Sequence, residues 1–353
     1  MSRLSNNYIK IRFLVVSIIM LYSCSSTSII CDSPTPEKSV SLMEYVEIGG
    51  IKQCVVIRSY NTDNPILLYV HGGPGTPELP LLRKFNSELE KHFTLVYWEQ
   101  RGTGKSFNSK LFKNLQIDDF VNDGIELTNY LLKRFNKEKL IIMGHSWGTI
   151  ISTKLVLKHP EKYHAYIGIG QIVDMKQGEH LSFRYTLAKA KEENNIKAIK
   201  ALTNSNNPEY LTIDGNTKWY KQLKTQRKWL TYYGGVIHKQ KDFSEYSKIY
   251  MKSKEYSLFD MVRFARGSVL SLITLWPEIM KVNLMNGCTE FQIPVYLIQG
   301  KHDYNCPTEL VQEYFNQISA PQKQLILFEN SAHNPIFEES ERFNEKVVEI
   351  LLK

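Results

Sequence analysis

A single serine stands where a strand-to-helix turn would expose it. Ser146 is the centre of Gly144-His145-Ser146-Trp147-Gly148, which follows an apolar run and precedes a helical pattern. The glycines permit a sharp turn, and the helix N-terminus that follows favours developing negative charge. Because a serine hydroxyl is a poor nucleophile without a base to remove its proton, this motif predicts partners elsewhere in the chain.

Two later loops carry the residue types that a serine nucleophile needs. Asp303 follows the apolar run 295–300, and His333 follows the run 325–329. Parallel strands end at one edge of a sheet, so these loops should meet Ser146 there. We predict that Ser146 attacks a carbonyl, His333 carries the proton and Asp303 orients His333, in the chain order Ser, Asp, His. His302 is expected to be structural.

A glycine-rich loop could supply donors for an oxyanion. The sequence His71-Gly-Gly-Pro-Gly75 follows the predicted strand 66–70, and its glycines let backbone approach a substrate closely. We predict that the backbone N–H groups of Gly73 and Trp147 hold the oxyanion. The alternative is a plain Gly/Pro turn.

The pattern of apolar runs indicates an α/β fold that positions these loops. Short apolar runs alternate with helical patterns, after a hairpin expected across Gly49-Gly50. This predicts a mostly parallel sheet flanked by helices, formed by residues 43–173 and 286–353. Residues 174–285 show helix-like, aromatic-rich stretches without clear strands, and are predicted to form an inserted helical lid.

Bulk composition excludes several classes of function. The 353 residues carry a net charge of +8, but the lysines are scattered and interleaved with acids. Without a basic block or aromatic platform, nucleic-acid binding is not expected. The sequence also shows no phosphate loop, metal-ligand cluster or dinucleotide fingerprint, so no cofactor is expected.

The N-terminus has the pattern of an export signal. Arg3, Lys10 and Arg12 precede an apolar run at 13–22, which is short for a membrane span. We predict a signal peptide at 1–23 and a tether at 24–42. The segment LYSC resembles a bacterial lipoprotein cleavage box, which predicts lipidation of Cys24 and an exported bacterial protein held at a membrane, periplasmic or at the cell surface; ordinary cleavage or an uncleaved anchor are the alternatives.

Export would permit disulfides among the remaining cysteines. These are widely spaced and fit neither a zinc site nor a small cross-linked scaffold. Pairing and free buried thiols both remain open for them: Cys31, Cys54, Cys288 and Cys306.

Four motifs in order carry a resemblance to a known family. They are HGGPG, the segment WEQRGTGKS at 98–106, the GHSWG turn, and the late Asp303 and His333 elements. Together they resemble the α/β-hydrolase fold family, and more narrowly its proline iminopeptidase-like branch. The resemblance spans about residues 43–353 and includes the lid. Glu99 stands where that branch usually has aspartate.

The resemblance implies that acids of the lid bind a free substrate amine. The Trp-rich stretch that usually carries one of them is missing after Gly170, so Glu179 and Glu278 are the candidates, each with a solvated or ion-paired helix residue as the alternative. Arg101 could meet a substrate carboxylate, but a structural role, pairing with Glu99 or capping carbonyls, is favoured.

Aromatic residues of the predicted lid are expected to be core rather than an acyl pocket. They are Trp219, Trp229, Tyr232 and Tyr233.

Three functions fit these motifs to different degrees. The first is an aminopeptidase of the proline iminopeptidase type acting on short peptides or amides. The second is a carboxylesterase, lactonase or amide hydrolase on small acyl substrates. The third is a surface-tethered binding protein without turnover, which should show a broken triad or a blocked oxyanion loop. Relatives that attack with a carboxylate are disfavoured because the turn carries Ser146.

Overall fold

The computed structural model describes residues 36–204, 208, 210 and 218–352. The predicted signal peptide, Cys24, Cys31 and most of the predicted tether lie outside these residues. The first strand begins at Val40. Residues 40–42 therefore belong to the sheet, which corrects the predicted tether boundary at residue 42.

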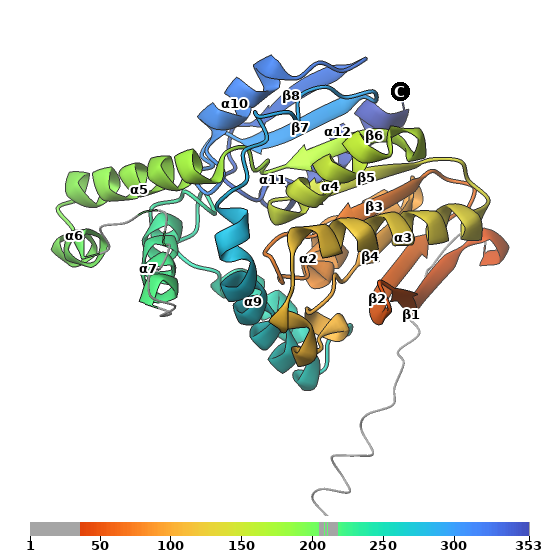
Figure 1. Cartoon of the computed structure of the whole chain (residues 1–353), viewed down its shortest axis with the longest axis horizontal. Helices are drawn as coiled ribbons and strands as arrows, with labels where there is room; N and C mark the ends of the chain where they lie inside the picture. Colours follow the sequence, from red (N-terminus) through yellow and green to blue (C-terminus); the bar gives the residue numbers. More distant parts are fainter. Residues whose placement is uncertain (1–35, 205–207, 209, 211–217, 353) are drawn as a thin grey trace, which may run out of the picture. The chain divides into compact units, whose positions relative to one another are not determined.

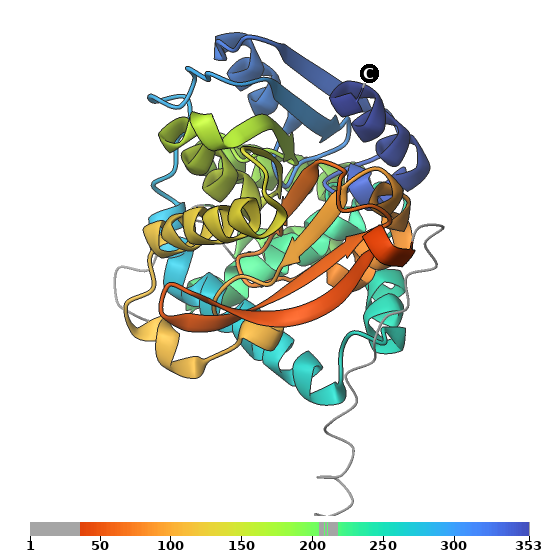
Figure 2. The ribbon, with the colours of Figure 1, turned by 90° about the vertical axis from the view of Figure 1, so that its right-hand side faces the viewer.

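One eight-stranded sheet organises the chain. Its spatial order is β1-β2-β4-β3-β5-β6-β7-β8. The β1–β2 and β2–β4 pairs are antiparallel, and every other neighbouring pair is parallel. The strands are β1 (Val40–Ile48), β2 (Ile51–Ser59), β3 (Ile66–Val70), β4 (Thr94–Trp98), β5 (Leu140–His145), β6 (Tyr163–Ile169), β7 (Val295–Gly300) and β8 (Lys323–Phe328). The predicted hairpin turns at Gly49-Gly50, both with positive φ, and lies at one edge of the sheet (Figure 2).

Helices cover both faces of this sheet because the strands are apolar on both sides. Along β3, Leu67 and Tyr69 pack into one core cluster while Leu68 and Val70 pack into another. The first face is covered by α2 (Leu79–Phe85), α11 (Pro335–Glu338) and α12 (Ser340–Leu352). The second is covered by α3 (Ile117–Phe135), α4 (Trp147–Lys158) and α10 (Thr308–Gln317) (Figure 1). The predicted α/β fold class is confirmed.

Between β6 and β7 the described chain is helical. Its helices are α5 (Met175–Glu192), α6 (Ile196–Thr203), α7 (Lys218–Tyr232), α8 (Ser244–Lys252) and α9 (Leu258–Ile279). We call this set the lid. The described residues of this segment form no strand; they make isolated bridges from Asp174 to Asn283 and from Glu290 to Ser319.

Short 3₁₀ helices complete the described elements. They are η1 (Pro36–Lys38), η2 (Ser87–Lys91), η3 (Gly104–Ser106), η4 (Ser109–Lys113) and η5 (Pro160–Lys162). Of the helices described, none combines the length and the apolar character needed to cross a bilayer.

Candidate active site

The turn between β5 and α4 holds Ser146 in a strained backbone conformation. Ser146 has φ 52° and ψ −120°, and it directly precedes the first residue of α4. A Cβ at Gly148 would lie 2.0 Å from the carbonyl oxygen of Val70, and one at Gly144 would lie 2.7 Å from that of Gly148. Neither contact is possible, so the helix can approach the sheet this closely only with glycine at both positions. A non-glycine residue at positive φ is uncommon, and such strain clusters at functional sites.

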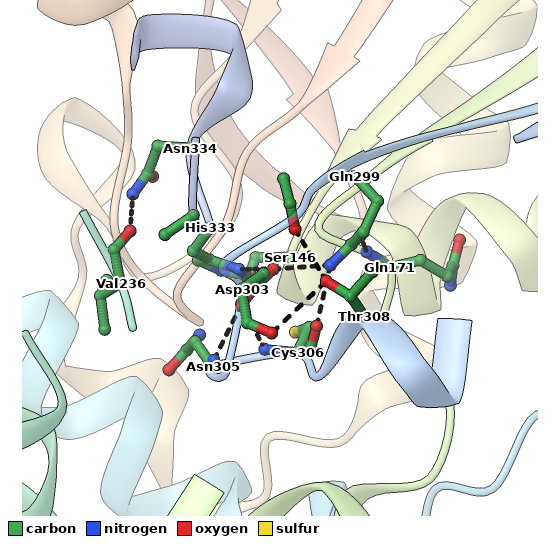
Figure 3. Close-up of polar contacts among 12 residues, drawn as sticks. Ser146, Gln171, Val236, Gln299, Asp303, Asn305, Cys306, Thr308, His333 and Asn334 are labelled. Atoms are coloured by element: carbon green, nitrogen blue, oxygen red, sulfur yellow. Dashed lines mark hydrogen bonds and ion pairs between the residues drawn. The ribbon is translucent and has the colours of Figure 1, made fainter. Parts of the chain in front are cut away.

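His333 and Asp303 come together from the loops after β8 and β7. The His333 Nδ1 lies 2.8 Å from the Asp303 Oδ2 (Figure 3). Both residues are buried, at 5% and 1% exposure. A carboxylate only accepts hydrogen bonds, so the proton belongs on Nδ1 and the lone pair of Nε2 is left to act as a base.

Four donors hold the Asp303 carboxylate in place. Its Oδ1 accepts the backbone N–H groups of Asn305 and Cys306, each at 2.8 Å. Its Oδ2 accepts the Gln299 side-chain amide at 2.8 Å in addition to His333. With both oxygens occupied, the carboxylate has one orientation relative to the imidazole.

The Ser146 hydroxyl has the Cys306 thiol as a hydrogen-bonding neighbour. Burial raises the pKa of the Cys306 thiol well above its usual value, so this thiol is protonated. No hydrogen bond among the described residues joins Ser146 Oγ to His333 Nε2. Bonds of this kind commonly tighten only in the substrate complex. Both side chains line the same cavity, which lets the bond form there.

That cavity has a volume of about 590 Å³ and lies between the sheet edge and the lid. Its lining includes Gly72, Gly73, Ser146 and His333. Apolar and aromatic side chains, mostly from the lid, form much of the remaining wall: Leu81, Val236, Phe243, Tyr246, Tyr250, Met251, Met261 and Phe264. A cavity of this size and lining accommodates a small organic substrate.

The predicted oxyanion loop is built around Gly73. This residue has φ +121°, and a Cβ there would lie 2.5 Å from the Gly75 nitrogen. The Trp147 backbone N–H belongs to the first turn of α4, where it has no intrahelical acceptor. Gly73 lines the cavity together with Ser146, and Trp147 directly follows Ser146 in the chain.

Buried hydrogen bonds through Gln100 connect the glycine-rich loop at His71 to Trp147. The Trp147 indole donates to Gln100 Oε1 at 2.9 Å, and the Gln100 amide donates to the His71 carbonyl at 2.9 Å. Burial lowers the pKa of His71 to about 4, so its ring is neutral and accepts the Gln100 N–H.

Sequence reasoning missed a buried ion pair beside Ser146. Glu78 Oε1 lies 2.8 Å from His145 Nδ1, and Glu78 Oε2 accepts the Gly72 N–H at 3.1 Å and the Tyr69 hydroxyl at 2.7 Å. Burial opposes both charges, but the His145 ring and the other donors hold the pKa of Glu78 below its usual value. Glu78 likewise raises the pKa of His145 against the effect of burial. The only signal was an acid shortly after the glycine loop.

The pair links three parts of the site. His145 Nε2 lies 3.2 Å from the carbonyl oxygen of His333, on the side of the ring opposite Glu78. A chain of contacts therefore runs from the oxyanion loop, through Glu78 and His145, to the histidine loop.

A second missed residue, Glu338, holds the histidine loop. Its Oε1 accepts the backbone N–H groups of Ala332 and Asn334, at 3.0 and 3.1 Å. Its Oε2 accepts the N–H of His238, from the segment between α7 and α8, at 2.7 Å. Burial raises the pKa of Glu338 to about 7. The carboxylate thus fixes the backbone on both sides of His333.

The segment 234–238, between α7 and α8, contacts the loops that carry Asp303 and His333. The Val236 carbonyl accepts the His333 N–H at 3.1 Å, and the Gly235 carbonyl accepts the Tyr304 N–H at 3.0 Å. The His238 ring stacks on His302, with centroids 3.7 Å apart. His302 therefore packs against His238 and does not line the cavity. This placement agrees with the structural role predicted for His302.

The two predicted amine ligands lie in different places. Glu179 is 2% exposed and is not itself part of the cavity lining, but it forms an ion pair with Arg227, which is part of that lining. Its Oε2 has no hydrogen-bond partner among the described residues. Glu278 instead accepts the Ile117 N–H at 2.9 Å, at the start of α3, and does not line the cavity. The placement of Glu278 at the substrate is therefore corrected: it caps a helix.

Arg101 is structural, but with a different partner from those predicted. Its guanidinium bonds both oxygens of Asp123, at 2.6 and 2.5 Å. Glu99 instead accepts the Tyr256 hydroxyl and the Lys105 N–H, each at 2.5 Å. Burial raises the pKa of Glu99 to about 7.

The lid aromatics pack among themselves, as expected. Trp219 belongs to one apolar cluster, and Trp229 with Tyr232 and Tyr233 to another; none lines the cavity.

The described cysteines Cys54, Cys288 and Cys306 are free thiols.

Comparisons with known proteins agree with this architecture. A family model described as the alpha/beta hydrolase fold matches residues 65–340. The chain is 31% identical over 315 residues to the probable aminopeptidase YbaC of Bacillus subtilis, covering 87% of this chain and 95% of that relative. It is 22% identical over 308 residues to a putative proline iminopeptidase of Mycoplasma genitalium, covering 82% and 91%. The crystal structure of a proline iminopeptidase from Mycobacterium smegmatis matches with a TM-score of 0.64 at 16% identity, over 88% of this chain and 97% of that chain.

The chain therefore belongs to the α/β-hydrolase fold family and is a hydrolase. Its resemblance to the proline iminopeptidase-like branch, predicted from the four motifs, is confirmed by these relatives.

Proposed function

We propose that the chain is a serine hydrolase in which Ser146, His333 and Asp303 form the catalytic triad. The observation that carries the proposal is the 2.8 Å contact between His333 Nδ1 and Asp303 Oδ2, with His333 and the strained Ser146 lining one cavity. Nucleophile, base and orienting acid thus have the arrangement that acyl transfer requires.

The reaction proceeds in two half-reactions. Ser146 Oγ bonds to the substrate carbonyl carbon while its proton passes to His333 Nε2, and the carbonyl electrons move to oxygen. The N–H groups of Gly73 and Trp147 stabilise that oxyanion. His333 then gives the proton to the leaving amine as the C–N bond breaks. Water, deprotonated by His333, releases the acyl group and restores Ser146.

We propose an aminopeptidase that releases N-terminal residues from short peptides or amides. The named activities of the relatives favour this class. A free substrate amine needs a carboxylate near the scissile bond, and Glu179 is the candidate. It is buried, one oxygen is unpartnered, and its ion-pair partner Arg227 lines the cavity.

A second candidate is a carboxylesterase, lactonase or amide hydrolase acting on small acyl substrates. The acids Glu78 and Glu179 are each already paired with a basic side chain, His145 and Arg227. The wall opposite Ser146 is largely apolar. Both features suit an uncharged acyl group.

Hydrolysis of matched substrates separates the two functions. The purified chain is assayed with prolyl, alanyl and leucyl arylamides, their N-acetylated forms, and p-nitrophenyl esters, with Ser146→Ala as control. An aminopeptidase cleaves the free-amine arylamides and not their N-acetylated forms, whereas an esterase cleaves the esters and neither form of the arylamides. If the wild-type chain were no more active than Ser146→Ala on every substrate, the proposed triad would be contradicted, and a binding protein without turnover would be the remaining hypothesis.

The proposed role of Glu179 has its own control. Glu179→Gln should raise KM for free-amine substrates at least about tenfold, because a charge-assisted hydrogen bond is lost. Glu278→Gln is the matched variant, since Glu278 caps α3 instead, and it should leave KM unchanged. Equal effects of both variants would exclude Glu179 as the amine ligand.

We also propose export, with the chain held at the membrane through a lipid on Cys24. The charged start, short apolar run and LYSC segment support this. In a bacterial host, the wild-type chain should fractionate with membranes and Cys24→Ser should not. Equal distribution of the two would contradict lipidation at this residue.

A further inference from the structure

The outer face of the lid exposes large apolar side chains. On α9, Leu258, Phe259 and Val262 are 77%, 64% and 55% exposed, and none of them lines the cavity. We call these three residues the apolar lid face. Exposed apolar groups gathered in this way commonly mark an interaction surface.

The packing of α9 explains why this face is left open. Asp260, Gly267 and Ser271 are on the buried side of the helix. A Cβ at Gly267 would lie 2.5 Å from the carbonyl oxygen of Gly102, so α9 rests directly on the loop before η3. The helix therefore has one side against the core, while Leu258 and Val262, one turn apart, face outward.

The charges around this face are basic. Lys252, Lys254 and Arg266 are exposed, and the Arg263 guanidinium lies over the Phe259 ring, 4.4 Å from its centroid.

The acids of residues 251–269 are already paired with bases. Asp260 pairs with Lys105 at 2.8 Å and with Arg263 at 3.6 Å, and Glu255 pairs with Arg83 at 3.5 Å. The positive charge that no acid of this segment neutralises is therefore that of Lys252, Lys254 and Arg266.

We propose that the apolar lid face lies on an anionic lipid surface. Apolar side chains flanked by lysine and arginine are the pattern of helices that bind in the interface plane of a bilayer. Each basic residue near an anionic surface adds about 1 kcal/mol of attraction. A second copy of the chain fits this face less well, because a two-fold contact would bring the same four basic residues of both copies together.

The position of β1 is consistent with the apolar lid face lying on a membrane. Tyr45 of β1 and Arg263 of α9 line the same surface hollow, and Tyr45 is itself 53% exposed. The first strand after the predicted tether thus shares a surface with the lid face.

Vesicle partition of the full chain tests the proposal. Phe259→Asp/Val262→Asp removes apolar contact and adds negative charge, and neither residue lines the catalytic cavity. The matched control is Ile196→Asp, which alters a 73% exposed side chain on α6. On vesicles containing phosphatidylglycerol, the double variant should partition about tenfold or more weakly than wild type. Ile196→Asp should match wild type.

Two further measurements test the basic residues of this face and the integrity of the apolar double variant. Lys252→Glu/Lys254→Glu should abolish the preference for phosphatidylglycerol over phosphatidylcholine vesicles without a change in melting temperature. The Phe259→Asp/Val262→Asp chain should retain the wild-type hydrolysis rate on a water-soluble substrate.

Equal partition of wild type and both double variants on the two vesicle types would overturn the proposal, because binding would then come from another part of the chain. A wild-type dimer that Phe259→Asp/Val262→Asp dissociates, with vesicle partition unchanged, would assign the face to a second copy instead.

Discussion

Replacing Asp303 by asparagine should invert the proton position on His333. Asp303 Oδ1 accepts two backbone N–H groups at 2.8 Å each. The amide oxygen of asparagine must take that place, because its NH₂ group cannot accept these bonds. The NH₂ group then replaces Oδ2 and donates a hydrogen bond to His333 Nδ1, so Nδ1 must be the unprotonated nitrogen. The single proton of the neutral ring therefore lies on Nε2, which can no longer accept the Ser146 proton.

The same change creates a second conflict. Gln299 donates its side-chain amide to Oδ2 at 2.8 Å, and this donor would now face another donor. An unsatisfied buried donor costs about 1–3 kcal/mol. We expect a modest fall in melting temperature and a loss in kcat of about 10³–10⁴-fold, the size seen when a triad histidine is held in the wrong tautomer.

Two assays check this reasoning. Turnover of the best wild-type substrate gives kcat and KM, and labelling by an organophosphonate probe measures the nucleophilicity of Ser146 without any assumption about substrate. Both rates should fall while KM changes little. Asp242→Asn, on an exposed lid residue, is the control. A kcat within tenfold of wild type would refute the orienting role of Asp303.

Three other substitutions test the surroundings of the site. Glu338→Gln places an NH₂ group against the backbone donors around His333 and should lower kcat about tenfold with KM within twofold. Glu345→Gln changes an exposed residue and should have no effect. Equal kinetics of the two variants would show that the Glu338 carboxylate is not needed to hold the His333 loop. Gly148→Ala should reduce the free energy of unfolding by at least about 3 kcal/mol in urea titrations, because its Cβ would lie 2.0 Å from the Val70 oxygen; wild-type stability would contradict that close approach. Burial raises the pKa of Glu99 from 4.5 to about 7, so ionised Glu99 lowers stability progressively as pH rises through this range. The stability of Glu99→Gln relative to wild type should therefore increase from pH 5 to pH 8, by up to about 3 kcal/mol, and a difference independent of pH would disprove this.

The fold and the placement of the triad loops were predictable because their signals are local. Five-residue apolar runs bounded by glycine or proline indicate buried parallel strands. Asp303 and His333 each follow such a run, and in a parallel sheet those loops share one edge. The Gly144–Gly148 turn likewise depends on steric limits that act within a few residues.

The side-chain partners of the site were not predictable in the same way. Glu278 and Glu179 are both acids on lid helices, yet one caps α3 and the other pairs with Arg227. Arg101 bonds Asp123 and not Glu99, the acid two residues away. Each outcome depends on how helices dock, which local sequence patterns do not encode.

The sequence by itself determined the class of fold and the residue types at the sheet edge, because backbone periodicity and turn chemistry are short-range properties. Only the tertiary structure decided that Glu78 pairs with His145 and that Glu338 joins the histidine loop to the lid. It also decided which side of α9 is left exposed. These features arise where segments far apart in the chain exclude water together, so their energies depend on packing geometry.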